Sequence, residues 1–253
     1  MIELLKNCSN GNDVSTYLVI RDTGFKKIVK IAATPVGIRN LRREAGGWGW
    51  YQEMRYPKKE EPICRIVQEG ESFLKIELEF MEGARADCRK GLEKNHENIR
   101  KAIEHYCEIW PSFPDGTAPL HGDLSLDNII YNDDGVHMID WEHFHEKGAP
   151  WGFDPLYLLF ETLFLRIRNG KRPSRAEVAI IADSIGFLNR KQELQSQMID
   201  RPLRFLVEFI TGNHRLWCDE LPAFQNKFPI LAFTADRVSS IDATIRARLK
   251  EGM

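Results

Sequence analysis

The alternation of apolar and polar positions predicts strands in the first third of the chain. Short β-branched segments at 16–20 and 27–31, separated by turn residues, predict an antiparallel hairpin. Segments 63–68 and 73–80 predict a second hairpin of the same kind. Between the two, 36–54 is predicted as a helix, although three glycines lower its intrinsic helix propensity. These residues should form a small antiparallel sheet with one helix.

Beyond this region the apolar period changes to that of a helix. Apolar residues recur at helical spacing through 90–110, which predicts an amphipathic helix. Two short strands, at 128–131 and 136–139, are joined by turn residues and predict a tight hairpin. The remainder reads as helices, with Pro202 expected to kink or divide the third. They are predicted at 156–168, 175–187, 191–211 and 235–250.

The fold class that follows is α+β, divided into two lobes. Residues 1–80 form an antiparallel β N-lobe with one helix, and residues 81–253 form a mostly helical C-lobe. The change of period from strand to helix places the boundary near Glu79–Gly83.

Composition narrows the class of protein without identifying it. Of 253 residues, 43% are hydrophobic and 28% charged, and the net charge of −2 gives no reason to expect a nucleic-acid partner. The five cysteines form no CxxC pair, which argues against a zinc site or a disulfide framework. No apolar run reaches the roughly 20 residues of a membrane helix. We therefore expect no membrane insertion and a cytoplasmic protein.

Three polar residues in the second lobe have the spacing of a phosphoryl-transfer site. Asp123 is followed five positions later by Asn128, and Asp140 lies one predicted hairpin further on. Phosphoryl transfer needs a carboxylate that orients the attacking hydroxyl and oxygen ligands for Mg²⁺. Because the turn folds the chain back, Asn128 and Asp140 can flank one metal ion.

The segments around these residues carry a family resemblance. His121-Gly-Asp-Leu-Ser-Leu-Asp-Asn128 followed by Ile139-Asp-Trp-Glu142 resembles the aminoglycoside phosphotransferase and choline kinase family, relatives of protein kinases. The resemblance implies a protein-kinase-like fold with ATP and Mg²⁺ as cofactors. It makes Asp123 the catalytic base and makes Asn128 and Asp140 the metal ligands.

Three further residues take supporting roles from the same resemblance. His121 would brace the catalytic loop. Asp154, in Gly152-Phe-Asp-Pro-Leu-Tyr157, would tie the helices of the C-lobe to the active site. Glu142 would face the substrate pocket.

The resemblance also implies a nucleotide-binding lysine and its glutamate partner in the N-lobe. Lys30 lies in the middle of a predicted strand and would grip the phosphates, with Lys26 and Lys27 as alternatives. Its partner would be Glu44, with Glu53 as the alternative. An exposed strand lysine and helix-surface glutamates are the simpler interpretation of the same residues.

Two segments would complete the nucleotide site. The polar loop that contains Ser9 and Asn10 would cover the phosphates in place of a G-x-G-x-x-G loop, and a plain hairpin turn is the alternative. The backbone carbonyl of Glu79 and the amide of Met81 would bind adenine at the junction between the lobes, unless this segment is an ordinary connector.

The function that these predictions favour is a small-molecule kinase. It would transfer the γ-phosphate of ATP to a hydroxyl of a carbohydrate, amino alcohol or aminoglycoside-like acceptor. A protein kinase is one alternative, but no Ala-Pro-Glu segment follows Asp140. A nucleotide-binding pseudokinase or scaffold is the other, and it would be expected to lack one of the catalytic groups. The sequence leaves the acceptor and the oligomeric state open.

Overall fold

The arrangement of the chain was obtained as a computed structural model, which describes residues 1–6, 13–163, 167, 171–217 and 229–252. The chain divides into two units. The first comprises Met1–Glu82 and Asp140–Glu146, and the second comprises Gly83–Ile139 and Lys147–Met253. Segment 140–146, which the sequence placed with the second lobe, thus belongs to the first unit.

The first unit contains a five-stranded antiparallel sheet in the order β1-β2-β3-β5-β4. Strand β3 is central, and Lys30 on it lies opposite Thr16 of β2 and Ile76 of β5. Both hairpins predicted from the sequence are confirmed. The strands are β1 (Ile2–Lys6), β2 (Val14–Ile20), β3 (Lys26–Ala32), β4 (Cys64–Gly70) and β5 (Phe73–Glu79).

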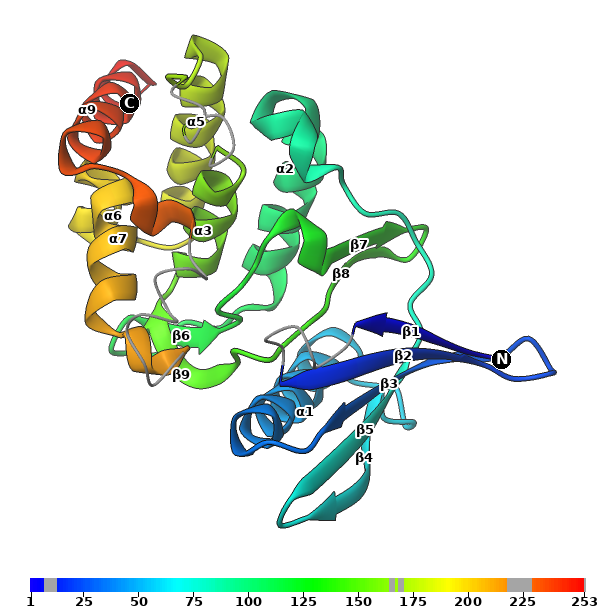
Figure 1. Cartoon of the computed structure of the whole chain (residues 1–253). Helices are drawn as coiled ribbons and strands as arrows, with labels where there is room; N and C mark the ends of the chain where they lie inside the picture. The colour runs from blue at the N-terminus through cyan, green and yellow to red at the C-terminus, as the bar shows by residue number, and fades with distance from the viewer. Residues whose placement is uncertain (7–12, 164–166, 168–170, 218–228, 253) are drawn as a thin grey trace. The chain divides into compact units, whose positions relative to one another are not determined.

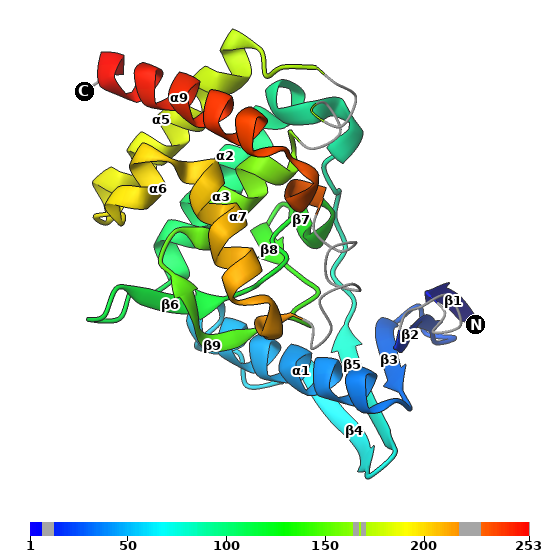
Figure 2. The same ribbon diagram turned by 60° about the vertical axis from the view of Figure 1, so that its left-hand side comes forward.

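One helix, α1 (Pro35–Arg55), lies across a face of this sheet and contacts β3, β4 and β5 (Figure 2). Thr34 caps it, since its hydroxyl accepts a hydrogen bond of 3.0 Å from the amide of Gly37. Pro35 occupies the first turn, where its missing N–H costs nothing. The helix forms despite its glycines because one of its faces is buried, and burial outweighs propensity.

The second unit is mainly helical (Figure 1). Helix α2 packs against α3 and α5, α5 packs against α9, and α7 packs against α3, α6 and α9. The helices are α2 (Gly91–Ile109), α3 (Phe153–Glu161), α5 (Arg175–Lys191), α6 (Ser196–Asp200), α7 (Pro202–Gly212) and α9 (Ala235–Gly252). Single 3₁₀ turns lie at Cys88–Lys90, Leu126–Asn128, His214–Leu216 and Pro229–Ala232.

A short hairpin in this unit carries the predicted metal-ligand region. Strands β7 (Ile129–Asn132) and β8 (Gly135–Met138) pair antiparallel, and the tight turn opposes Asn132 to Gly135. Two other strands, β6 (Thr117–Leu120) and β9 (His145–Pro150), form a second small ladder. The sequence did not predict this ladder, because its strands are short and contain proline.

The predicted helices are confirmed with shifted ends. Pro202 divides the third as expected, since α6 ends at Asp200 and α7 begins at Pro202. Helix α3 begins at Phe153 instead of 156, because the Asp-Pro step lies within its first turn, where proline is tolerated. Among the described residues, no helix combines the length and apolar character needed to cross a membrane.

Candidate active site

The first unit holds a buried ammonium group between two carboxylates. The Nζ of Lys30 lies 2.6 Å and 2.8 Å from the two carboxylate oxygens of Glu44, and 2.6 Å from Oδ1 of Asp140. The Lys30 side chain is 12% exposed, that of Glu44 1% and that of Asp140 31%. Strand β3, helix α1 and segment 140–146 each supply one member of this cluster.

Burial and charge act in opposite directions on the ionisation of these groups. Burial by itself would lower the pKa of Lys30, but the carboxylates of Asp140 and Glu44 outweigh it and raise the pKa above its ordinary value. Burial raises the pKa of Glu44 to about 7, against the effect of the Lys30 ammonium. Two carboxylates thus face one fixed cation, and the more exposed of them is Asp140.

The backbone at Asp140 is unusual. Its φ of 65° lies in the left-handed region, and among the described residues it is the one non-glycine residue with positive φ. Asp is among the residues that tolerate this conformation, which still costs on the order of 1–2 kcal/mol. Backbone strain of this kind collects at functional sites, where the surrounding packing maintains it.

An aromatic cluster supplies that packing. Trp141 is fully buried and lies against Trp48, Trp50 and Tyr51 of α1, with ring centroids 5.1–6.4 Å apart. Gly47 permits the close approach, because a Cβ at this position would lie 2.6 Å from the Cβ of Trp141. The cluster therefore holds the helix that carries Glu44 against the segment that carries Asp140.

The alternatives to the lysine and its glutamate are paired elsewhere or exposed. Lys26 pairs with Glu82 at 2.8 Å and Lys27 with Glu77 at 2.6 Å. Glu53 lies on the exposed side of α1. The structure therefore selects Lys30 and Glu44 as the buried pair.

The second unit holds the residues of the predicted catalytic loop. The side-chain amide nitrogen of Asn128, Nδ2, donates to the backbone carbonyl of Asp123 at 2.8 Å and to the Oδ2 atom of Asp123 at 3.2 Å. Both partners are acceptors, so the NH₂ group must be on this branch of the side chain, and the amide oxygen is on the other. An amide oxygen is the atom that Mg²⁺ binds, so Asn128 fits the role of a metal ligand.

The backbone of this loop is braced by His121. Its Nε2 lies 3.0 Å from the carbonyl of Ile139, and a carbonyl can only accept, so Nε2 carries the proton. In the neutral tautomer Nδ1 is then an acceptor, and the amide of Asp123 donates to it at 3.4 Å. The ring is fully buried and fixes the loop on both sides.

Asp154 holds the same loop from helix α3. Its carboxylate accepts hydrogen bonds from the backbone amides of His121 (2.9 Å) and Gly122 (3.0 Å). Burial raises the pKa of Asp154 to about 7, although both backbone hydrogen bonds lower it. The first turn of α3 is a favourable place for this carboxylate because helix N-termini attract negative charge.

Two residues that sequence reasoning did not assign also contact the loop. Tyr157 places its hydroxyl 3.5 Å from Oδ1 of Asp123. Trp217 donates from its indole nitrogen to the carbonyl of Gly122 at 2.7 Å. Tyr157 follows Asp154 by three positions on α3, so helical spacing could have identified it. No sequence signal identifies Trp217.

The remaining predicted residues lie in several places. Glu79 ends β5 and pairs with Lys59 at 2.5 Å, and Met81 is half-buried in the following connector. Glu142 lies 3.5 Å from Nε2 of His143. Ser9 and Asn10 fall outside the described residues. Among the residues that are described, no three His, Cys, Asp or Glu side chains form a metal cluster.

Comparisons with known proteins test the fold. No family model matches the sequence, and no curated protein matches it. Solved structures do match. An ethanolamine kinase from Plasmodium vivax has a TM-score of 0.54 at 13% identity, with 99% of this chain and 81% of that chain covered.

Two further matching structures are also those of a kinase and a phosphotransferase by their names. An amicoumacin kinase with AMP-PNP, Ca²⁺ and Ami has a TM-score of 0.50 at 11% identity, covering 100% of this chain and 88% of its own. A GDP complex of an aminoglycoside 2'-phosphotransferase IIIa variant has a TM-score of 0.50 at 11% identity, covering 100% and 92%. This chain has the fold of the aminoglycoside phosphotransferase and choline kinase family. The predicted α+β class with a kinase-like fold is thereby confirmed, and the arrangement in two lobes stays a prediction.

The close packing around Trp141 predicts different effects for alanine substitutions at two glycines of α1. Replacement of Gly47 by Ala places a methyl group 2.6 Å from the Cβ of Trp141, so α1 must shift. We expect a loss of about 1–3 kcal/mol in unfolding free energy, measured by chemical denaturation. Gly49→Ala is the matched control, since nothing lies within 4 Å of a Cβ there. It should be neutral or stabilising, and equal effects of the two substitutions would contradict the packing argument.

The buried carboxyl of Asp154 predicts a pH dependence of stability. Its pKa is about 7 in the folded chain against an ordinary 3.8, so the folded state binds the proton more tightly. Its contribution to stability is complete below pH 3.8 and is lost as pH rises through 7. A single group of this kind changes the unfolding free energy by at most about 1.4 kcal/mol per pH unit.

Chemical denaturation between pH 5 and pH 8 measures this slope. Asp154→Asn should flatten it, whatever its effect on stability at any one pH. Asp183→Asn removes an exposed carboxyl of α5 and serves as the control. An unchanged slope in Asp154→Asn would refute the assignment.

Proposed function

We propose that this protein is an ATP-dependent phosphotransferase that phosphorylates a hydroxyl group of a small molecule. The observation that carries the proposal is the Lys30 ammonium held between Glu44 and Asp140 on a phosphotransferase fold. A buried lysine fixed in this way is a cation prepared for phosphate groups. The catalytic loop with Asp123 and Asn128 supplies the second set of groups that the reaction needs.

The chemistry assigned to Asp123 is that of a base. The oxygen of the acceptor hydroxyl forms a bond to the γ-phosphorus of ATP, the bond from that phosphorus to the bridging oxygen breaks, and ADP leaves. The hydroxyl proton passes to the carboxylate of Asp123. Asn128 and Tyr157 orient that carboxylate through their contacts with its two oxygens.

The side-chain oxygens of Asn128 and Asp140 are of the kind that bind a magnesium ion. The amide of Ile139 donates to the carbonyl of Asn128 at 3.0 Å, and Asp140 is the next residue in the chain. We infer that the amide oxygen of Asn128 and the carboxylate of Asp140 would hold Mg²⁺. The ion, when bound, neutralises charge on the β- and γ-phosphates. Lys30 binds the α- and β-phosphates, and the backbone of 79–81 binds adenine.

The acceptor class is proposed from the carboxyl groups near the loop. Glu161 on α3 has a buried oxygen, Oε2, that has no hydrogen-bond partner among the described residues. Burial and the nearby Asp127 raise the pKa of Glu161 to about 7. A protonated amine would satisfy both carboxyls, which favours an amino alcohol or aminoglycoside-like acceptor over a neutral carbohydrate. The names of the matching ethanolamine and aminoglycoside enzymes are in keeping with this choice.

Release of ADP from Mg-ATP measures the activity, with ethanolamine, choline, aminoglycosides and neutral sugars as acceptors. Asp123→Asn should lower kcat by roughly 10²–10⁴-fold, because the base is lost. Asp133→Asn, in the exposed turn of the β7–β8 hairpin, is the control and should retain activity. ATP binding without turnover on any acceptor would point to a nucleotide-binding scaffold. Absence of ATP binding would refute the kinase proposal.

The two glutamates of α1 provide a matched pair. Glu44→Gln removes the charge that fixes Lys30, so kcat/KM for ATP should fall about tenfold or more, equivalent to at least ~1.4 kcal/mol. Glu53→Gln changes the same residue type on the exposed side of the helix and should leave kcat/KM within about twofold. Steady-state kinetics with varied ATP measures both. Similar losses in the two variants would remove Lys30–Glu44 from the nucleotide site.

A further inference from the structure

The peptide unit between Gly122 and Asp123 is held at both of its polar ends. Its carbonyl, which is that of Gly122, accepts a hydrogen bond of 2.7 Å from the indole nitrogen of Trp217. Its N–H, which is that of Asp123, donates to Nδ1 of His121 at 3.4 Å. Because a peptide unit is planar, fixing its oxygen and its hydrogen fixes the orientation of the whole unit. These two bonds therefore set the direction in which the backbone enters Asp123.

The segment that contains this peptide unit has no strand or helix to hold it. It lies between the end of β6 at Leu120 and the 3₁₀ turn that begins at Leu126. Gly122 has a φ of 84°, in the left-handed region that glycine adopts readily, and its amide donates to Asp154. A buried carbonyl without a partner is unfavourable, so the direction of the Gly122 carbonyl depends on the donor that Trp217 supplies.

The indole of Trp217 is itself fixed by its surroundings. Trp217 is 3% exposed, and its ring lies against that of Phe153, with centroids 6.1 Å apart. Phe153 in turn contacts the ring of Phe209 on α7 at 4.9 Å. The backbone amide of Trp217 donates to the carbonyl of His214 at 3.0 Å. A donor held both by packing and by its own backbone can impose a direction on its acceptor.

On the other side of Asp123, the chain is held by groups of the loop itself. The amide of Ser125 donates to the carbonyl of Asp123 at 2.9 Å, and Nδ2 of Asn128 donates to the same oxygen at 2.8 Å. Trp217, in contrast, lies 95 residues from Gly122 in the sequence. Its hydrogen bond therefore connects the loop to a distant segment of the second unit.

We propose that Trp217 is a positioning residue for Asp123, acting through the Gly122–Asp123 peptide unit. The inference rests on the proposed function, in which Asp123 is the base. A base must lie within hydrogen-bonding distance of the acceptor hydroxyl, and a displacement of about 1 Å can cost about 10²-fold in rate. Lys30 and segment 79–81, which are proposed to bind ATP, belong to the first unit. Trp217 should therefore affect turnover and leave ATP binding unchanged.

Trp217→Phe keeps an aromatic ring against Phe153 and removes the indole donor. We expect kcat to fall about tenfold or more, while KM for ATP stays within about twofold of the parent value. Adding Trp217→Phe to Asp123→Asn should lower the residual kcat by less than about twofold, because the effect passes through the base. Losses that multiply in the double variant would contradict the positioning role.

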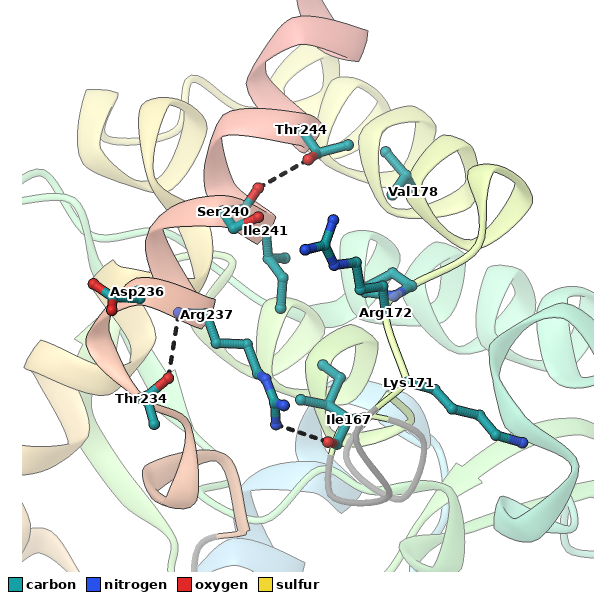
Figure 3. A pocket seen from close by; sticks show the side chains of 11 residues that line it. Ile167, Lys171, Arg172, Val178, Thr234, Asp236, Arg237, Ser240, Ile241 and Thr244 are labelled. Carbon is teal, nitrogen blue, oxygen red and sulfur yellow. Dashed lines mark hydrogen bonds between the residues drawn. The ribbon is translucent and has the colours of Figure 1, made fainter.

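Two other side chains of the second unit donate to distant backbone carbonyls outside the loop. Trp151 donates from its indole nitrogen to the carbonyl of Trp110 at 3.2 Å. Arg237 donates to the carbonyl of Ile167 at 2.9 Å, at the wall of a cavity of about 730 Å³ that no residue assigned to catalysis lines (Figure 3). Trp151→Phe and Arg237→Met should therefore lower stability in chemical denaturation and leave kcat within about twofold. Losses of kcat equal to that of Trp217→Phe would overturn the proposal.

Hydrogen exchange followed by mass spectrometry measures the loop directly and does not require turnover. In Trp217→Phe, the peptides that cover 120–128 should exchange about tenfold faster or more, and in Trp151→Phe they should exchange as in the parent. Unchanged protection of the loop in Trp217→Phe would overturn the proposal. If the loop exchanges faster as expected but the parent phosphorylates no acceptor, the proposed function is refuted and Trp217 still positions the loop.

Discussion

Burial of one ammonium group is the constraint on which the first unit depends. Lys30 projects from the central strand into a largely dry environment, and an isolated charge there would cost several kcal/mol. Glu44 must therefore lie on the face of α1 that meets the sheet, and Asp140 must reach the same nitrogen. Helix α1 supplies the first of these carboxylates, and Asp140, with its left-handed backbone, supplies the second. A cation held this firmly would lose little freedom on binding a phosphate group, as the proposed function requires.

Aromatic packing stabilises the arrangement of α1 and segment 140–146. Ion pairs specify which charges meet, but they contribute little net stability once desolvation is counted. The stability has to come from the burial of Trp141 against Trp48 and Tyr51, which involves large apolar surfaces. Gly47 sets how closely the two backbones approach. Polar specificity and apolar stability are thus supplied by neighbouring residues of one helix.

In the second unit, side chains hold in place a loop that has little regular secondary structure. The loop at 121–128 forms few backbone hydrogen bonds of its own, so side chains from distant segments supply them. Asp154 receives two of its amides, His121 bridges it to Ile139, and Trp217 donates to the carbonyl of Gly122. All three side chains are buried, and each forms at least one hydrogen bond with the backbone of the loop. Asp123 and Asn128 can then be oriented by rigid surroundings.

The sequence by itself determined most of the secondary-structure elements and predicted which groups would be reactive. Alternation of apolar residues identified both hairpins, Pro202 marked the division between α6 and α7, and the spacing of Asp123, Asn128 and Asp140 is a local property of the chain. Tertiary structure decided the pairings. Helical periodicity puts both Glu44 and Glu53 on α1, and only packing against the sheet buries one and exposes the other. Contact between Trp217 and Gly122, or between Arg237 and Ile167, joins residues far apart in sequence. Local patterns carry no information on such contacts, because these are fixed by the way helices and strands pack.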